Sequence, residues 1–327
     1  MKDKVVAILG PTATGKSACA IEVAKRLGGE IISGDSMLVY QNMNIGTAKP
    51  TAAELASVPH HLVDILPPSA KFSVVDFKLR AEELIADINA RGKLPIIAGG
   101  TGLYIKALLE NYSFNEVDED TELRRKLEQE AEENGPERLY ERLQELDPEA
   151  AGLIHPNNVR RVVRALESAL KGGHVGQSSA VNQAATDAAE EQDRASLLAK
   201  MPYDALVFGL SMERSFLYER INKRVDIMLE AGLEDEVRGL LAQGVPTDCQ
   251  AMQSIGYRQM VWYLENGMPY DEAVAKLKQA TRNFAKRQLT WYRKMPYIEW
   301  FEVTRELEYQ KIIEAMCQKC QALLFKA

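Results

Sequence analysis

Short apolar runs alternate with amphipathic stretches through residues 1–100 of the chain. The runs Val5–Leu9, Glu30–Ile32 and Leu94–Ala98 predict strands, and the apolar spacing of Ala18–Leu27 predicts a helix between the first two. A further helical segment precedes Leu94. Strands that alternate with helices in this way pair in parallel and are covered by helices. We therefore expect an α/β fold with a parallel sheet at its core.

The pattern changes between residues 115 and 200. Helical periodicity runs through Thr121–Asn134, Pro136–Leu146 and Val159–Lys171, with few runs of β-branched residues. We interpret residues 115–200 as an all-helical insertion domain in a core made of residues 1–114 and 201–327. Within it, Gly172–Arg194 is rich in Ala, Ser, Gln, Asp and Glu, and we expect a mobile loop there.

The core pattern resumes after the insertion. Ala205–Leu210 predicts another strand, and helical periodicity follows in Arg214–Gln243, Ser254–Asn266 and Asp271–Lys294. Because ligands of open α/β sheets bind at the carboxyl ends of the strands, the residues that follow the strands are the candidates for function.

Gly10, Asp35 and Thr101 each follow one of the first three predicted strands. The carboxyl ends of parallel strands lie at the same edge of a sheet, so these residues are expected to meet in one crevice. Asp35 in that position suits either a general base or a metal ligand.

Composition argues against a membrane protein, a secreted protein and a disulfide-rich protein. The chain has 327 residues, of which 46% are hydrophobic and 27% charged, as is typical of a globular protein. No run approaches the roughly eighteen apolar residues of a membrane span, and the first residues predict a strand instead of a signal peptide. The four cysteines show no disulfide framework, and the single pair Cys317 and Cys320 lacks a second pair to complete a zinc site. A soluble cytoplasmic protein is expected.

The strongest local motif is Gly10-Pro11-Thr12-Ala13-Thr14-Gly15-Lys16-Ser17, which matches G-x-x-x-x-G-K-[ST] between a predicted strand and a predicted helix. Its backbone N–H groups and the helix terminus bind phosphate oxygens, Lys16 adds a positive charge, and the Ser17 hydroxyl can ligate Mg²⁺. The loop alone leaves open whether the phosphates belong to a nucleotide or to another diphosphate. A kinase or ATPase would have an Asp at the end of a second strand, whereas Leu94–Ala98 ends in Gly99-Gly100-Thr101.

Further motifs follow the phosphate loop in a fixed order. They are Asp35-Ser36-Met37 with Tyr40, Ile45–Pro50, Pro59–Asp64, Gly99–Tyr104, His155–Arg161, Ile255–Gln259 and Thr281–Trp291. Together with the loop, this ordered set resembles the tRNA dimethylallyltransferase family over nearly the whole chain. The resemblance implies a P-loop-type core with a helical insertion that grips the tRNA anticodon arm.

The resemblance also implies a reaction and its residues. A dimethylallyl group would pass from dimethylallyl diphosphate to the exocyclic amine of the adenosine 3′ of the anticodon, with Mg²⁺ as cofactor. Asp35 would accept the amine proton, and Thr101 and Arg224 would act with Lys16 on the charge that builds on the leaving diphosphate. The diphosphate-binding set would be Gly10, Thr12, Ala13, Thr14, Gly15, Lys16 and Ser17.

Two basic stretches favour contact with RNA in a chain whose formal net charge is -7. One crowds Arg160, Arg161 and Arg164 in the insertion, and the other, free of acidic residues, spans Thr281–Lys294. The adenine is expected to be extruded into a pocket near Asp35–Leu38. The full expected tRNA-contacting set is Asp35, Ser36, Met37, Leu38, Arg160, Arg161, Arg164, Gly256, Tyr257, Arg258, Arg282, Lys286 and Arg287.

The chain departs from the family pattern at Leu38, where Gln is usual, and at Gln41, where Arg is frequent. The main alternative function is a P-loop small-molecule or nucleotide kinase, which the missing Asp-terminated strand disfavours. A second alternative is an RNA-binding adaptor without activity, against which the intact Lys16, Ser17 and Asp35 argue. We expect the enzyme to act as a monomer.

Overall fold

The computed structural model describes residues 2–114, 121–172 and 194–324. The chain forms two compact units, Met1–Glu110 with Asp193–Ala327, and Asn111–Gln192. Helix α10 (Arg194–Lys200), which we assigned to the insertion on its sequence, therefore belongs to the first unit. Apart from its two end residues, the loop expected at Gly172–Arg194 lies outside the described residues.

The first unit is built on a six-stranded sheet with the order β3-β2-β4-β1-β5-β6. The strands are β1 (Lys4–Leu9), β2 (Glu30–Ser33), β3 (His60–His61), β4 (Pro95–Gly99), β5 (Asp204–Ser211) and β6 (Glu299–Glu302). All neighbouring strands pair in parallel, which confirms the expected α/β class. Leu9 pairs with both Gly99 and Gly209, so β1 and β4 end at the same level and β5 continues two residues further, to Ser211.

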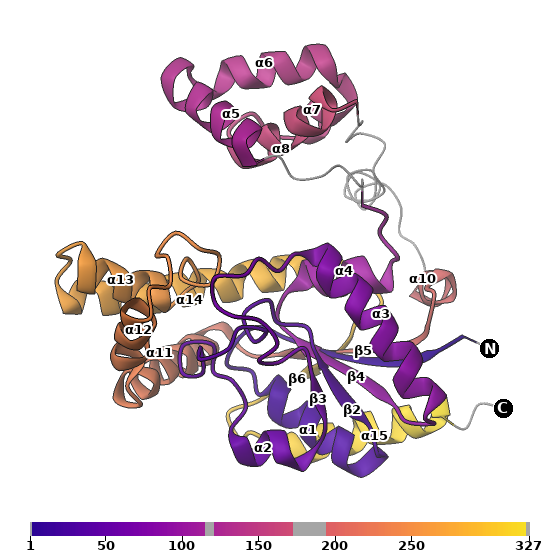
Figure 1. Cartoon of the computed structure of the whole chain (residues 1–327). Coiled ribbons are helices and arrows are strands. Elements are labelled where there is room, and N and C mark those ends of the chain that lie inside the picture. The colour runs from indigo at the N-terminus through magenta and orange to yellow at the C-terminus, as the bar shows by residue number, and fades with distance from the viewer. Residues whose placement is uncertain (1, 115–120, 173–193, 325–327) are drawn as a thin grey trace. The chain divides into compact units, whose positions relative to one another are not determined.

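The apolar side chains of β1 point alternately to the two faces of the sheet. Val5, Ala7 and Leu9 pack with helices α3 (Val74–Ala90) and α4 (Gly102–Leu109). Val6 and Ile8 pack with α1 (Lys16–Leu27) and α15 (Tyr309–Leu324) on the opposite face. Figure 1 shows these two helix pairs on either side of the sheet. Residues two apart on a strand share a face, so one apolar run serves two cores.

The remaining helices of this unit are α2 (Ala52–Ser57), α11 (Arg214–Glu230), α12 (Leu233–Ala242), α13 (Tyr257–Glu265) and α14 (Tyr270–Tyr292). The helical periodicity of Arg214–Gln243 corresponds to two helices, α11 and α12, because Gly232 with φ of 95° separates them and precedes α12. Similarly, Gly256 with φ of 100° delays the helix expected from Ser254 until Tyr257. Glycine adopts such left-handed conformations without the clash of a Cβ atom.

Every helix or strand among the described residues of the second unit is a helix. Its helices are α5 (Thr121–Asn134), α6 (Pro136–Leu146), α7 (Pro148–Leu153) and α8 (Val159–Leu170). Their apolar sides form a separate core that includes Leu139, Leu143, Val162 and Leu166. Helices α5 and α6 begin and end at the residues expected from periodicity.

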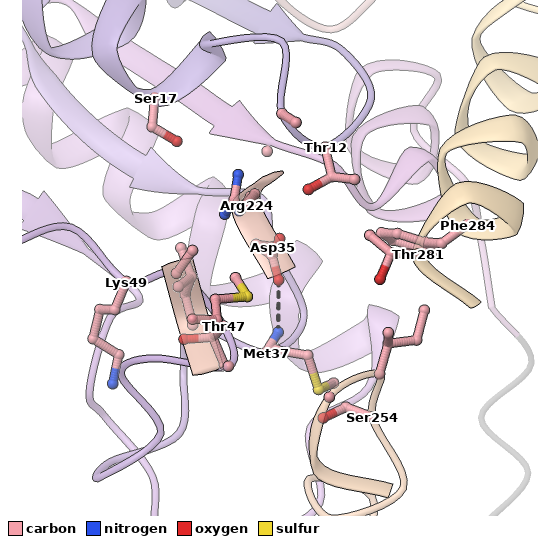
Figure 2. A pocket seen from close by; sticks show the side chains of 18 of the residues that line it. Thr12, Ser17, Asp35, Met37, Thr47, Lys49, Arg224, Ser254, Thr281 and Phe284 are labelled. Carbon is pink, nitrogen blue, oxygen red and sulfur yellow. Dashed lines mark hydrogen bonds between the residues drawn. The ribbon is translucent and has the colours of Figure 1, made fainter. Parts of the chain in front are cut away.

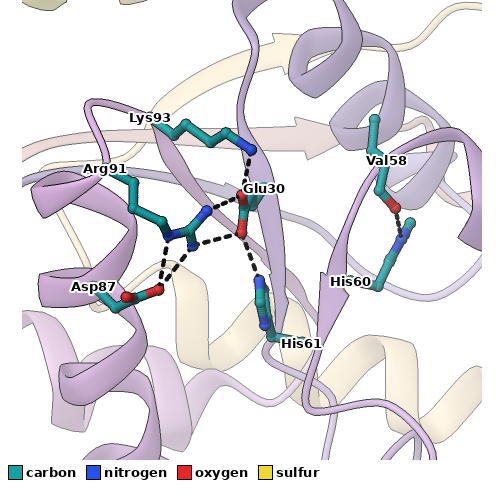
Figure 3. Close-up of polar contacts among 7 residues, drawn as sticks. All are labelled: Glu30, Val58, His60, His61, Asp87, Arg91 and Lys93. Carbon is teal, nitrogen blue, oxygen red and sulfur yellow. Dashed lines mark hydrogen bonds and ion pairs between the residues drawn. The ribbon is translucent and has the colours of Figure 1, made fainter.

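A buried carboxylate at the amino end of β2 joins residues in or next to α3, β3 and β4 (Figure 3). Glu30, the first residue of β2, accepts hydrogen bonds from Arg91 (Nη2 to Oε2, 2.9 Å) and Lys93 (2.7 Å) and pairs with His61 Nε2 at 2.8 Å. The Arg91 hydrogen bonds keep the pKa of Glu30 far below its usual range, against the opposing effect of burial. The cluster stabilises the sheet at the end opposite the carboxyl ends of the strands.

Cys317 and Cys320 lie buried in the core that α1 and α15 share with the sheet. Burial raises the pKa of the Cys320 thiol to about 12. Among the described residues no three His, Cys, Asp or Glu side chains gather in a way that could hold a metal ion. Within the same residues, no helix combines the length and the apolar character needed to cross a membrane.

Candidate active site

A cavity of about 590 Å³ lies at the carboxyl ends of the strands in the first unit (Figure 2). Its walls come from the phosphate loop, the turn after β2, the segment of residues 46–50, and helices α11, α13 and α14. Of the residues expected from the sequence, those that line it are Thr12, Ala13, Gly15, Lys16, Ser17, Asp35, Ser36, Met37, Leu38, Arg224, Gly256, Arg258 and Arg287. Of the three residues expected to meet in one crevice, only Asp35 lines the cavity, together with residues of the phosphate loop; Gly10 and Thr101 do not.

Gly10 and Thr14 do not line the cavity. Both are buried, and the Thr14 hydroxyl donates to the carbonyl of Pro11 at 2.8 Å, inside the loop itself. Ala13 and Gly15 have positive φ, of 68° and 90°, which turns the chain sharply into α1. Gly10 and Thr14 thus contribute to the conformation of the phosphate loop and do not face the ligand.

Asp35 stands on a turn that its own side chain stabilises. Its Oδ1 accepts a hydrogen bond from the backbone N–H of Met37 at 2.9 Å, drawn as the dashed line in Figure 2. The Ser36 N–H donates to the hydroxyl of Thr101 at 3.1 Å, and the Thr101 N–H donates to the carbonyl of Gly34 at 3.2 Å. Thr101 is absent from the cavity lining, so in this structure it holds the Asp35 turn and does not face the cavity.

Lys16 and Arg224 bring two positive charges to the partly desolvated cavity. Burial lowers the pKa of Lys16 to about 8, with Asp35 opposing the change and Arg224 adding to it. Burial also lowers the pKa of Arg224, again opposed by Asp35. Two cations around one carboxylate leave the cavity with an excess of positive charge, which suits an anionic ligand.

The cavity wall that contains residues 46–50 is fixed by a carboxylate. Glu236 of α12 accepts hydrogen bonds from the N–H groups of Asn44 (2.7 Å), Ile45 (2.8 Å) and Gly46 (3.1 Å). The hydroxyl of Tyr257 donates to the same carboxylate at 2.5 Å. Tyr257 is fully buried, so it supports this wall and presents no surface to RNA, unlike the contact expected from the sequence.

Helices α13 and α14 contribute arginines at the mouth of the cavity. Arg258 lies over the ring of Trp262 and Arg287 over that of Phe284, with guanidinium carbons 5.3 and 5.8 Å from the ring centroids. Both line the cavity. Arg282 and Lys286 do not; Arg282 donates to the Asn222 side chain at 2.7 Å, and Lys286 is exposed.

The arginines of the insertion lie on one side of α8. Arg160, Arg161 and Arg164 are all exposed, whereas Val162 and Leu166 of the same helix are buried. They belong to the second compact unit, whereas the cavity is lined by residues of the first.

Three side chains that hold the phosphate loop were not among the residues expected. Gln288 accepts from the Thr12 N–H at 3.0 Å, Arg220 donates to the Ala13 carbonyl at 2.9 Å, and Tyr309 donates to the Thr14 carbonyl at 2.9 Å. Gln288 lies in the motif Thr281–Trp291, which marks the segment without indicating this contact. Tyr309 lies in a helix that we had not delimited.

The comparisons with known proteins agree with this site. Residues 38–295 match the family model described as IPP transferase. The chain belongs to that family. A tRNA dimethylallyltransferase of Geobacillus thermodenitrificans is 49% identical over 304 residues, which are 93% of this chain and 92% of the relative. One of Oceanobacillus iheyensis is 45% identical over 312 residues, 95% of each chain. The resemblance seen in the motifs is confirmed.

Solved structures of the IPP transferase family share the fold. The full-length tRNA isopentenylpyrophosphate transferase of Bacillus halodurans has a TM-score of 0.71 and 43% identity, covering 99% of this chain and 97% of its own. A eukaryotic dimethylallyltransferase acting on tRNA has a TM-score of 0.74 and 27% identity, covering 98% of this chain and 80% of its own. The match over both compact units supports a P-loop-type core with a helical insertion.

Proposed function

We propose that this enzyme transfers a dimethylallyl group from dimethylallyl diphosphate to the exocyclic amine of the adenosine 3′ of the anticodon in tRNA. The observation that carries the proposal is the placement of Lys16, Asp35 and Arg224 around one cavity. An anion-binding loop and a carboxylate base in one cavity are what the transfer of a group from a diphosphate to an amine requires. Membership of the IPP transferase family and relatives named tRNA dimethylallyltransferase support the same activity.

The diphosphate end of the donor binds at the phosphate loop. The amino terminus of α1 and the loop N–H groups face the oxygens, and Lys16 and Arg224 supply charge. As the carbon–oxygen bond breaks, negative charge grows on the diphosphate, and these cations stabilise it more strongly than in the ground state. Ser17 is exposed and lines the cavity, so its hydroxyl would hold Mg²⁺. The metal would supply further charge neutralisation.

Asp35 takes the proton. The amine nitrogen forms a bond to the first carbon of the dimethylallyl group, the bond from that carbon to the bridging oxygen breaks with both electrons, and diphosphate leaves. The amine proton passes to the Asp35 carboxylate, whose orientation is fixed by the Met37 N–H. Thr101 positions the turn that carries Asp35 through the Ser36 N–H.

The tRNA is held by positive charge outside the cavity. Arg258 and Arg287 at its mouth contact the nucleotides beside the extruded adenine, where Ser36, Met37 and Leu38 form the pocket wall. The exposed arginines of α8 bind backbone phosphates of the anticodon arm. Arg282 and Lys286 add to this field from α14.

A transfer assay tests the proposal against the kinase alternative. Unmodified tRNA is incubated with the enzyme, Mg²⁺ and either dimethylallyl diphosphate or ATP, and the mass of the tRNA is measured. We expect a mass increase equal to one dimethylallyl group with the first donor, and no tRNA-stimulated ATP hydrolysis. Phosphorylated product, or ATP turnover comparable to transfer, would contradict the proposal.

A further inference from the structure

Gln288 is a polar side chain buried between two elements of the active site. It lies on α14, is 4% exposed and lines the cavity. Lone buried amides are costly unless both their donor and their acceptor are satisfied. The donor and the acceptor of the Gln288 amide both bond to backbone groups far away in sequence, and these two hydrogen bonds fix the position of the side chain.

The two partners of Gln288 belong to the two loops that carry the chemistry. Its Oε1 accepts from the N–H of Thr12 in the phosphate loop at 3.0 Å. Its Nε2 donates to the carbonyl of Gly100 at 2.8 Å, in the turn between β4 and α4. One rigid carboxamide thus spans from the donor-binding loop to the turn at the end of β4.

The turn reached by Gln288 leads directly to Asp35. Thr101, next to Gly100, accepts from the Ser36 N–H and donates its own N–H to Gly34, on either side of Asp35. A continuous path of hydrogen bonds therefore connects the phosphate loop, Gln288, the Gly100 turn and the turn of the base. Such a path sets the separation between the leaving group and the base.

The fit at Gly100 shows how closely Gln288 packs there. A Cβ atom at Gly100 would lie 2.3 Å from Nε2 of Gln288, closer than any real contact, whereas the nearest atom of another residue, Lys16 Cε, would be at an ordinary 3.7 Å. The φ of Gly100 lies outside the left-handed range, so the backbone itself accepts a side chain. The absence of a side chain at position 100 serves the Gln288 contact.

We propose that Gln288 is a positioning residue that fixes the phosphate loop relative to the Asp35 turn, and that Gly100 is required to admit it. This inference rests on the proposed transfer reaction. Displacement of reacting groups by about 1 Å can cost about 10² in rate, so the loss of this link should appear in the transfer step.

A double-mutant cycle tests the pairing of Gln288 with Gly100. Single-turnover transfer is measured at saturating tRNA and donor for wild type, Gly100→Ala, Gln288→Ala and the double variant. We expect each single change to slow transfer about tenfold or more. The double variant should lie within about twofold of Gln288→Ala, because truncation removes the atom that the new methyl group would meet. Losses that multiply would overturn the proposal.

A near-isosteric change separates positioning from packing. Gln288→Met fills the same space and removes both hydrogen bonds, and Gln279→Met, at an exposed site on α14, is the matched control. We expect Gln288→Met to weaken the binding of inorganic diphosphate with Mg²⁺ by about tenfold and to lower the transfer rate, with KM for tRNA unchanged. A lower Tm with wild-type diphosphate affinity and rate would assign Gln288 a purely structural role.

The diphosphate titration keeps the two proposals separable. If the wild-type enzyme transfers nothing to tRNA, the proposed function fails. The calorimetric affinity for inorganic diphosphate would still decide whether Gln288 organises the phosphate loop. If transfer occurs, and Gln288→Met has the wild-type transfer rate and diphosphate affinity, only the positioning role of Gln288 is refuted.

Discussion

Lys16 should make donor binding sensitive to pH in a range where lysines ordinarily do not titrate. Its pKa is lowered from 10.5 to about 8, mainly by burial. About nine tenths of the side chain is then charged at pH 7 and about one tenth at pH 9. If only the ammonium form binds the diphosphate, the affinity for dimethylallyl diphosphate should fall about tenfold over these two pH units. With an ordinary pKa it would hardly change.

Calorimetric titration of the donor without tRNA, at constant ionic strength and pH 7, 8 and 9, measures this directly. Lys16→Arg is the matched control, because a guanidinium keeps its charge throughout the range. Its affinity should be flat with pH, even if lower overall. A flat wild-type profile would refute the lowered pKa. An equal decline in Lys16→Arg would assign the pH effect to another group.

The same pKa predicts an effect on stability, with a definite sign. Because the pKa of Lys16 is lower in the folded state, the unfolded chain binds more protons between about pH 8 and 10.5. The charged lysine therefore destabilises the fold below about pH 8, and this penalty is relieved as pH rises through that window. Lys16→Met should be more stable at pH 7 by up to about 3 kcal/mol. Urea unfolding at pH 7 and pH 10 should show the difference shrinking.

Further changes test the other walls of the site. Asp35→Asn keeps the shape of the side chain but removes the proton acceptor, which acts in the transition state. It should lower the single-turnover transfer rate by about 10² or more, with the tRNA affinity within about tenfold of wild type. A near wild-type rate would remove Asp35 from the mechanism. Arg161→Gln and Arg287→Gln should each weaken tRNA binding and reduce its salt slope by about one, with donor binding unchanged; unaltered slopes would make both ordinary surface charges. Glu236→Ala leaves three backbone N–H groups without their carboxylate, so chemical unfolding should show a loss of about 1–3 kcal/mol, and an unchanged stability would contradict that role.

The elements around the phosphate loop were predictable because their signals are local. The run Val5–Leu9 is apolar on both faces, as a central strand requires, and it became β1 with one added residue. By contrast, β6 (Glu299–Glu302) has the sequence EWFE and lies at the edge of the sheet, where alternation over four residues is too short to distinguish. The two-residue strand β3 has no periodicity at all. Both were missed.

Some residues of the candidate site were also predictable from local sequence, and others were not. Lys16 and Asp35 follow strands, so parallel pairing alone places them at one edge of the sheet. Arg224 came from the family resemblance, since its helix carries other cations, such as Lys223, from which the sequence alone does not distinguish it. Tyr257 was misplaced because its motif also marks the buried support of the wall, where its hydroxyl reaches Glu236. A motif identifies residues that matter without stating whether they face the ligand or the core.

What no local pattern reveals is how the phosphate loop keeps its shape. Thr12, Ala13 and Thr14 are held by side chains 276, 207 and 295 positions later in the chain. Each bond joins a side chain to a backbone group, which accepts many partners, so neither spacing nor hydropathy points to it. A loop held by fixed groups in this way is organised before the diphosphate arrives, and little reorganisation is then needed as charge develops. The common loop motif therefore leaves the chemistry open, and the distant elements that surround it decide which reaction it serves.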